Sequence, residues 1–302
     1  MMNTVERSSN SHLREKKLQQ PDLAGCWEAR LTLGFANRGG KCNLVDKSHR
    51  GPLYVQRAFY PEGPDLAHVY LLHPPGGMVS GDRLEVEVTV NDKARVLLTT
   101  PGAGKVYKAR ADQSLQQQFN HIRLGREASC EWFPQENIIF NAARACLETR
   151  IDLSPDSLFQ GWEITVLGLP ANELEFVSGE LSQRFVVNVD GRPRLIENLV
   201  IDDHSRELLS SSAGMRHQPV CGLYVAGPVP QEFGLEECLQ DLRELVVPEG
   251  SYWGVTVIDG FVVIRFLGSC AEQARKLFIA VWQRLRPVLA GRPACLPRIW
   301  AT

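Results

Sequence analysis

Hydrophobic and polar residues alternate with a period of two over much of the first two-thirds of the chain. Residues 83–90 place Leu or Val at every second position with Arg, Glu and Thr between them, and residues 145–153 and 185–189 repeat the pattern. A strand with one buried and one solvated face has this period. Many such strands separated by turn residues predict a large β-assembly over about residues 23–202, and not a sheet of β-α-β units.

Turn residues in this region predict how neighbouring strands connect. Asn91-Asp92 follows the first of these strands and predicts a hairpin with a strand at residues 94–100. Asp190-Gly191 is typical of the two-residue turns that join antiparallel strands.

Towards the C-terminus the hydrophobic period becomes helical. Apolar residues recur three or four positions apart within residues 235–246 and again within residues 274–285, which predicts two helices. Ser269 and Glu272 predict a capping box at the start of the second helix, which should end near residues 287–291.

The segment between the two helices contains Asp259-Gly260, which predicts a β-hairpin. Strand, helix, hairpin and helix would form a smaller C-terminal α+β element of about residues 219–290, packed on the edge of the β-body. Residues 1–20 carry few apolar side chains, which predicts a disordered polar tail. We therefore expect a mainly β fold in one domain, residues 21–302, with a smaller C-terminal α+β element containing two helices.

The charge balance argues against two classes of partner. The chain has 33 Lys and Arg against 35 Asp and Glu, so nothing indicates binding to nucleic acid or to an anionic membrane. The first twenty residues lack the apolar stretch of a secretion signal, and no run of about eighteen apolar residues would span a membrane. We therefore expect a cytoplasmic protein.

The eight cysteines lie at least 16 residues apart, which excludes a C-x-x-C zinc or redox motif. In a reducing compartment, most of them should be free thiols that pack as small buried apolar residues.

Three Gly/Pro-rich segments follow one another between Gly51 and Lys108: GPLYVQRAFYP, YLLHPPGGMVSGD and LLTTPGAGKVYKAR. The last contains a Gly-Lys pair like the end of a P-loop, but Thr99 and Val106 stand where that motif requires Gly and Ser or Thr. The second contains a His followed by glycines, as in a hydrolase oxyanion loop, yet the chain has no G-x-S-x-G nucleophile motif. Neither enzyme class is therefore indicated.

Taken in order, the three segments resemble the urease accessory protein D (UreD) family. Two further motifs extend the resemblance to about residues 23–302, namely WFPQE at residues 132–136 and LPRIW at residues 296–300. The chain departs from the family pattern at Leu169, where the family usually has Arg.

The resemblance implies a urease maturation chaperone and not an enzyme. It would be a scaffold and nickel conduit that, with urease accessory protein F and the GTPase accessory protein, delivers a transiently bound nickel ion to apo-urease. A dimer within the accessory complex is a further expectation from the resemblance. The family's acidic residues associated with nickel passage correspond by motif position to Asp82, Glu163 and Glu197. Isolated carboxylates hold nickel loosely enough to release it, and His73 could add an imidazole.

The residues themselves leave alternatives open. Asp82 also fits a turn aspartate that accepts hydrogen bonds from nearby backbone N–H groups, and His73 fits a structural hydrogen bond. A metal-dependent hydrolase on a β-scaffold would use His73 and Asp82 as ligands. An adaptor that binds proteins but no metal is the remaining alternative.

Two clusters are candidates for partner docking, because aromatic and basic residues occur together in binding surfaces. One comprises Lys105, Tyr107 and Lys108, and the other comprises Arg298 and Trp300. Solvated surface is the alternative for the first cluster, and packing against the body of the protein is the alternative for the second.

Overall fold

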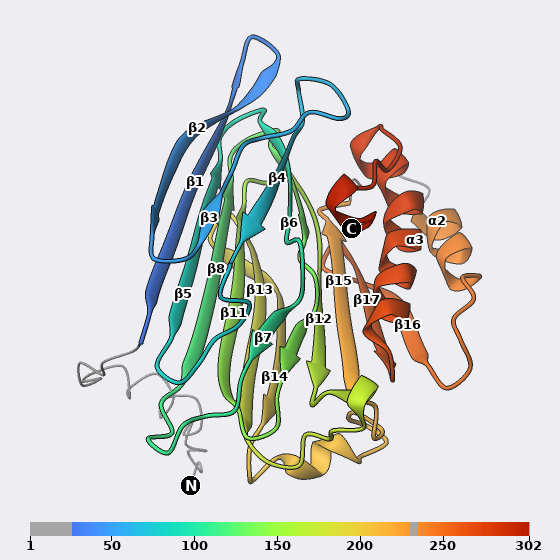
Figure 1. Ribbon diagram of the computed structural model, residues 1–302. Helices are drawn as coiled ribbons and strands as arrows, with labels where there is room; N and C mark the ends of the chain where they lie inside the picture. The colour runs from blue at the N-terminus through green and yellow to red at the C-terminus, as the bar shows by residue number, and fades with distance from the viewer. Residues whose placement is uncertain (1–25, 230–234, 302) are drawn as a thin grey trace, which may run out of the picture.

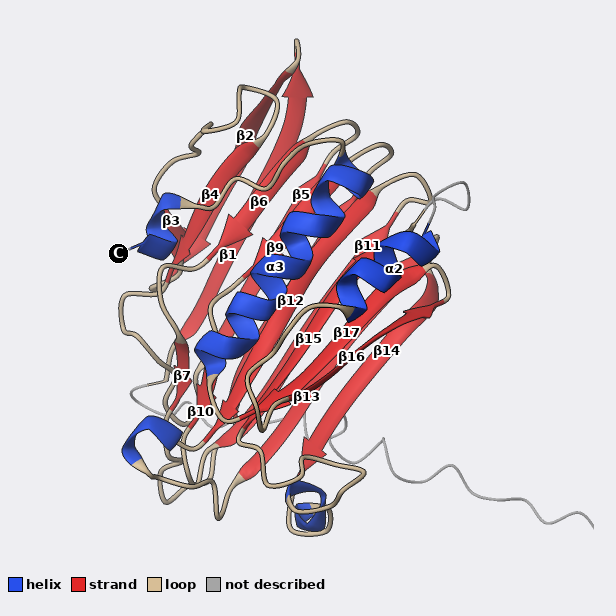
Figure 2. Cartoon of the chain, turned by 90° about the vertical axis from the view of Figure 1, so that its right-hand side faces the viewer, coloured by secondary structure: helices blue, strands red, loops and turns tan. Residues whose placement is uncertain are grey.

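Two β-sheets pack face to face, and two helices cover the outer face of the second sheet (Figures 1 and 2). The computed structural model describes residues 26–229 and 235–301. The prediction of a mainly β fold with a smaller C-terminal helical element is confirmed. The predicted tail at residues 1–20 lies outside the described residues.

The first sheet has seven strands in the order β14-β13-β11-β8-β5-β1-β2. Strands β1, β5, β8, β11 and β13 run parallel to one another, and β2 and β14 pair antiparallel at the two edges. The bounds of these strands are β1 Glu28–Arg38, β2 Lys41–Arg50, β5 Arg83–Val90, β8 Gln116–Leu124, β11 Arg144–Leu153, β13 Glu180–Val189 and β14 Arg192–Ile201.

The second sheet has ten strands, eight of them in the order β16-β17-β15-β12-β9-β6-β4-β3, with β10 paired to β12 and to β7. The C-terminal strands continue this sheet, because β15 pairs antiparallel with β12 and β17 pairs antiparallel with β15. The bounds are β3 Tyr54–Val55, β4 Ala67–Leu72, β6 Arg95–Thr99, β7 Gly104–Val106, β9 Ser129–Phe133, β10 Asn137–Ile139, β12 Leu158–Leu167, β15 Val220–Gly227, β16 Tyr252–Ile258 and β17 Phe261–Gly268.

The predicted hairpin at Asn91-Asp92 is wrong, because the chain crosses there from one sheet to the other. Strand β5 pairs with β1 and β8, whereas β6 pairs with β4 and β9. Val96 and Leu98 pack between the sheets, while Leu97 packs in the cluster beneath the helices. A strand that is buried on both faces belongs in the centre of a covered sheet, and this requirement decides the pairing.

Two other turns form the predicted hairpins. Asp190 and Gly191 have φ angles of 48° and 72° and join β13 to β14, and Asp259 and Gly260 have φ angles of 46° and 81° and join β16 to β17. Two successive positive φ angles match the twist of the flanking antiparallel strands.

Both predicted helices are present, as α2 Leu235–Arg243 and α3 Ala271–Ala290. Short 3-10 turns lie at η1 Pro170–Asn172, η2 Arg206–Leu209 and η3 Arg298–Ala301. The predicted capping box is wrong, because Cys270 is the N-cap without a side-chain cap and Glu272 pairs with Lys276 at 2.8 Å. Ser269 lies one residue too early to cap the helix. Gly291 ends α3 in the left-handed conformation, one turn after Pro287.

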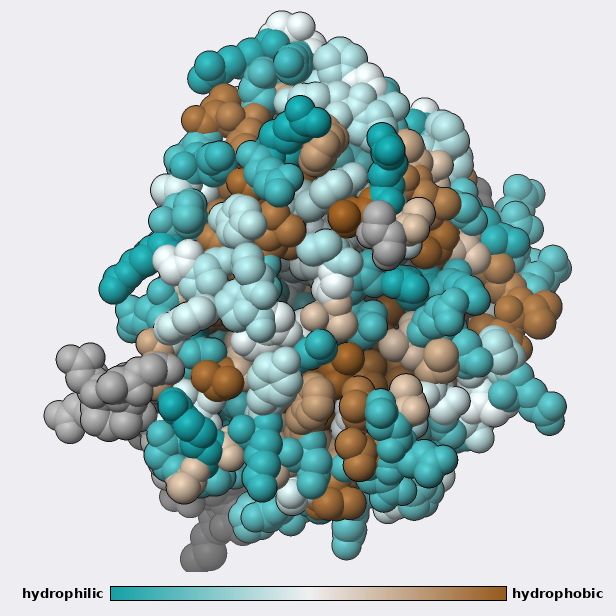
Figure 3. All heavy atoms as spheres, in the orientation of Figure 1, coloured by the Kyte–Doolittle hydropathy of each residue, from teal (hydrophilic) through white to brown (hydrophobic). Residues whose placement is uncertain are grey.

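Apolar side chains form two clusters, one between the sheets and one between the second sheet and the helices. On the face drawn in Figure 3, hydrophobic residues appear only in scattered groups among hydrophilic ones. None of the eight cysteines, all of which lie in the described residues, is in a disulfide, but only Cys42 and Cys130 are buried, so the prediction that most are buried is wrong. The other six are half-buried, and two of them, Cys221 and Cys238, pack against the clusters.

Arg286 of α3 is fully buried beneath the helix and joins two carboxylates. Its Nε and Nη2 donate to the two oxygens of Glu131 at 2.8 Å, and its Nη1 and Nη2 donate to Glu62 at 2.6 and 2.8 Å. Burial opposes the ionisation of Glu62, but hydrogen bonds from His68 and Arg286 outweigh it and hold the pKa of Glu62 at about 2. The indole N–H of Trp282 completes the cluster with a 2.7 Å hydrogen bond to Glu131.

We expect Arg286→Met to lower the free energy of unfolding by about 3–5 kcal/mol, because the buried Glu131 and the half-buried Glu62 lose their cation. Urea unfolding of the variant measures the loss. Arg284→Met, on the exposed side of the same helix, is the matched control and should change the free energy of unfolding by less than about 0.5 kcal/mol. Equal losses in the two variants would contradict this role of the buried cluster.

Candidate functional site

A group of polar side chains crosses the otherwise apolar space between the two sheets. Each occupies an inward position of its strand, in phase with buried apolar neighbours, as Glu197 is with Leu195 and Ile201. We call the following eight residues the interior stripe: Gln118, Asn120, Thr149, Glu163, Thr165, Gln183, Glu197 and Arg265.

Strand register aligns these residues across the two sheets. The first sheet places four inward residues side by side on neighbouring strands: Asn120, Thr149, Phe185 and Glu197. The second sheet does the same with three: Glu163, Leu223 and Arg265. Because adjacent strands are about 4.8 Å apart, each row extends from the interior of the sandwich towards its open side.

Glu163 lies at the centre of the interior stripe and is 8 % exposed. Its Oε2 accepts a 2.9 Å hydrogen bond from Gln183 Nε2, and Gln183 Oε1 accepts a 2.8 Å bond from Thr165 Oγ1. Burial raises the pKa of Glu163, and hydrogen bonds from Thr149 and Gln183 only partly oppose the rise. These partners are neutral side chains, in contrast to the guanidinium that compensates Glu131.

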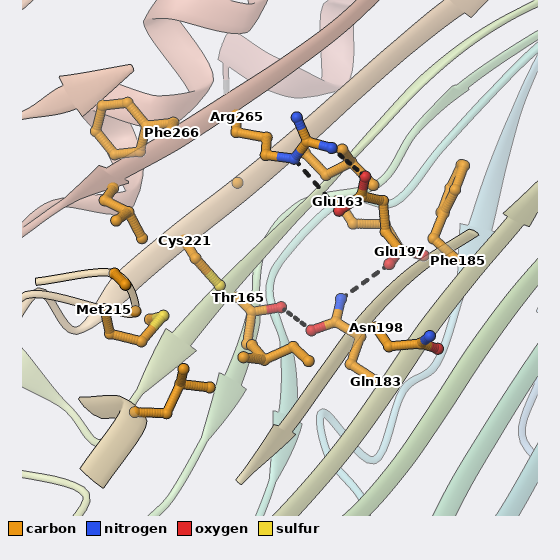
Figure 4. A pocket seen from close by; sticks show the side chains of 17 residues that line it. Glu163, Thr165, Gln183, Phe185, Glu197, Asn198, Met215, Cys221, Arg265 and Phe266 are labelled. Atoms are coloured by element: carbon orange, nitrogen blue, oxygen red, sulfur yellow. Dashed lines mark hydrogen bonds and ion pairs between the residues drawn. The ribbon is translucent and has the colours of Figure 1, made fainter. Parts of the chain in front are cut away.

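Glu163 is a lining residue of two cavities. The first has a volume of about 420 Å³ and is shown in Figure 4, where Glu163 and Glu197 extend from opposite sheets. The second has a volume of about 210 Å³ and is lined by His73, Asn120 and Trp132 among others. Three of the predicted residues thus line these neighbouring cavities: Glu197 lines the first, His73 the second and Glu163 both.

The open side of the first cavity carries an ion pair between the sheets. Arg265 Nε lies 3.3 Å from Glu197 Oε2, and Arg265 Nη2 makes a second contact with Oε1 (Figure 4). The two side chains are 48 % and 28 % exposed, so water reaches both.

Burial also shifts the pKa values of a thiol and an imidazole that line these cavities. Burial raises the pKa of the Cys221 thiol in the first cavity to about 12, and the charge of Glu163 adds to the rise. Burial lowers the pKa of His73, and the nearby charge of Asp82 opposes that change. At neutral pH, the thiol therefore keeps its proton and burial favours an uncharged imidazole.

Asp82 has a structural role that the other predicted carboxylates lack. It is buried, and its Oδ1 and Oδ2 accept hydrogen bonds from the backbone N–H groups of Trp27 at 2.9 Å and Val79 at 2.8 Å. It does not line either of the two cavities that Glu163 lines. The geometry is that of a turn aspartate, and its part in metal passage stays a prediction.

The docking candidates lie in different settings. Tyr107 packs on Phe140 with ring centroids 5.2 Å apart, next to the half-buried Lys105 and the exposed Lys108. Trp300 donates a 2.8 Å hydrogen bond from Nε1 to Thr99 Oγ1 and packs in the aromatic cluster beneath α3.

Trp300 is thus held by the body of the protein, whereas Arg298 is exposed beside it. A docking role for these clusters stays a prediction. Leu169, at the departure from the family pattern, is held to Leu174 by backbone hydrogen bonds of 2.7 and 3.2 Å.

Six members of the interior stripe were not predicted from the sequence as site residues: Gln118, Asn120, Thr149, Thr165, Gln183 and Arg265. The signal that could have identified them is a polar residue in the inward phase of a strand. Asn120 alternates in phase with Ile122 and Leu124, and Arg265 with Val263 and Leu267. A polar group at such a position is costly unless it has a partner or a function.

The described residues lack two features. Within residues 26–229 and 235–301, no three or more His, Cys, Asp or Glu side chains are grouped closely enough to hold a metal ion. No helix in the same part of the chain is both long and apolar enough to span a membrane.

Comparison with known proteins identifies the class to which this two-sheet scaffold belongs, that of the urease accessory proteins. The model of the UreD urease accessory protein family matches residues 28–301. The chain belongs to the UreD family. The resemblance inferred from the sequence motifs is thereby confirmed.

Curated relatives named urease accessory protein UreD support this assignment. The chain is 43 % identical over 284 residues to the protein of Marinomonas sp. (strain MWYL1), with 92 % of this chain and 91 % of the relative covered. It is 41 % identical to that of Alcanivorax borkumensis, with 91 % and 92 % covered, and 39 % identical to that of Dechloromonas aromatica, with 94 % and 98 % covered. The family assigns the chain a role in urease maturation. An accessory protein is a maturation factor and not an enzyme, in agreement with the prediction of a non-enzymatic role.

We expect Glu163→Gln to stabilise the fold increasingly as pH rises. A carboxyl with a raised folded pKa is ionised at lower pH in the unfolded chain, so the wild type loses stability as pH rises above about 4.5. The amide of the variant would keep an acceptor for Gln183 without this dependence. Thermal unfolding of both proteins between about pH 4.5 and 8 measures the difference. Glu148→Gln on the outer face of β11 is the control, and a pH-independent difference for Glu163→Gln would refute the expectation.

Proposed function

We propose that the chain is a scaffold and nickel conduit that, with urease accessory protein F and the GTPase accessory protein, delivers nickel to apo-urease. The observation that carries the proposal is the position of Glu163, a buried carboxylate that lines both internal cavities. A cation could pass from the His73 side to the Glu197 side by contacting one carboxylate midway.

The donor atoms along this route suit reversible binding of nickel. Carboxylate oxygens of Glu163 and Glu197 and the imidazole of His73 are ligand types that nickel accepts. Neutral hydrogen-bond partners leave Glu163 without a compensating cation, so an arriving dication would favour its ionised form. Ligands spread along a path, instead of gathered at one point, favour transient binding of the ion as cargo.

In this proposal, the GTPase accessory protein hydrolyses GTP and this chain does not. The loop of residues 100–104 lacks a complete P-loop pattern, and in the structure it lines the second cavity. This loop therefore suits a wall of the ion path better than a phosphate site. The family implies contact with urease and other accessory proteins, and we place the complex, including its dimeric form, in the cytoplasm.

An adaptor that binds proteins but no metal is the second candidate. Leu174 and Val177 are 55 % and 62 % exposed on one loop, which favours a protein-binding surface. The metal-dependent hydrolase is not favoured, because the family is one of maturation factors.

We expect Glu163→Gln and Glu197→Gln each to lower the nickel content of urease by roughly ten-fold, because each removes a charged ligand from the route. Nickel per active site is measured in urease purified from cells that express the complete urease gene cluster. Glu148→Gln, on the outer face of the first sheet, should leave the nickel content unchanged. Normal nickel content with both cavity variants folded would eliminate the conduit and leave the adaptor.

A further inference from the structure

The first cavity contains a cationic side chain of the protein itself. Its charged lining residues are Glu163, Glu197 and Arg265. Arg265 occupies an inward position of β17, between Val263 and Leu267, where the strand would otherwise present only apolar side chains to the first sheet. Its guanidinium still reaches water, so the contact with Glu197 is a solvated ion pair, which is weak enough to exchange.

In the structure, the guanidinium of Arg265 is bound to the carboxylate of Glu197. Its Nε and Nη2 contact the two carboxylate oxygens separately, in the fork arrangement that guanidinium and carboxylate groups favour. The pair joins the two sheets, because Glu197 belongs to β14 and Arg265 to β17. Any cation that binds both oxygens of Glu197 must first displace Arg265.

We propose that Arg265 gates the cavity, by occupying Glu197 until a divalent cation displaces its guanidinium into solvent. The inference rests on the proposed conduit function. Arg265 is 48 % exposed, so its guanidinium has water to move into when it leaves Glu197. The pair therefore has two accessible arrangements, closed on Glu197 and open towards solvent.

The gate also selects the class of cation. A monovalent alkali ion offers the carboxylate no more charge than the guanidinium that it would replace, and it lacks the directional hydrogen bonds. A dication offers twice the charge at a shorter distance, so it can compete. Once displaced, Arg265 repels a second cation approaching the same side of the cavity. The arrangement favours the entry of one divalent ion at a time.

The test is the affinity of the full-length chain for nickel(II), measured by equilibrium dialysis. Arg265→Gln removes the competing charge and should bind nickel about ten-fold more tightly than the wild type. Arg265→Met keeps the aliphatic part of the side chain and should show the same increase in affinity for nickel. It replaces Arg265→Gln in the test if that variant fails to fold. Adding Glu197→Gln to Arg265→Gln should abolish the gain, because the released carboxylate is then absent.

Arg194→Gln is the matched control. Arg194 also lies on β14 and pairs with Asp259 at 3.0 Å in the turn between β16 and β17, so it joins the same elements without lining the cavity. The affinity of Arg194→Gln for nickel should equal that of the wild type.

Three outcomes would overturn the gate. Unchanged or weaker affinity in folded Arg265 variants, with nickel binding by the wild type, would reject the gate and leave the conduit standing. An equal gain in Arg194→Gln would attribute the effect to loosening of the two sheets. Absence of nickel binding by the wild type and by both Arg265 variants would reject the conduit together with the gate.

Discussion

The burial of carboxylates between apolar layers is the constraint on which this structure depends. A desolvated carboxylate is tolerated only when it is paired, hydrogen-bonded or protonated. Beneath α3 the chain pairs Glu131 and Glu62 with Arg286, which fixes the helix on the second sheet. Between the sheets Glu163 has only neutral partners, and burial raises its pKa. The first arrangement stabilises the fold, and the second leaves a carboxyl group available to an incoming cation.

The two-sheet architecture explains how residues far apart in the sequence reach one place. Parallel strands β5, β8, β11 and β13 follow one another across the first sheet, while the segments between them enter the second sheet. The later strands supply the interior stripe, two residues each from β8 and β12 and one each from β11, β13, β14 and β17. The open side of the sandwich, where β14 faces β17, then brings Glu197 to Arg265. The buried carboxylate therefore follows from the crossings between sheets, and the ion pair follows from the two hairpins that place β14 and β17.

Local sequence patterns predicted the positions of strands and turns better than they predicted which strands pair. The two Asp-Gly turns fix positive φ angles that only a tight hairpin requires, so both hairpins were predictable. The turn at Asn91-Asp92 carries no information about the sheet that β6 enters, because that choice depends on distant strands β4 and β9. The motif positions of Glu163 and Glu197 were predictable from the family resemblance. The inward phase of Arg265 is visible in the sequence, but its pairing with Glu197 is not, because that pairing depends on how the two sheets are placed.

Anomalous diffraction from crystals of the chain soaked with nickel(II) tests the central claim most directly, because it locates the ion instead of inferring its path. The account predicts anomalous density between the two sheets, within coordination distance of the Glu163 or Glu197 carboxylate. Density confined to surface side chains, with both cavities free of nickel at saturating concentration, would contradict passage of the ion through the interior.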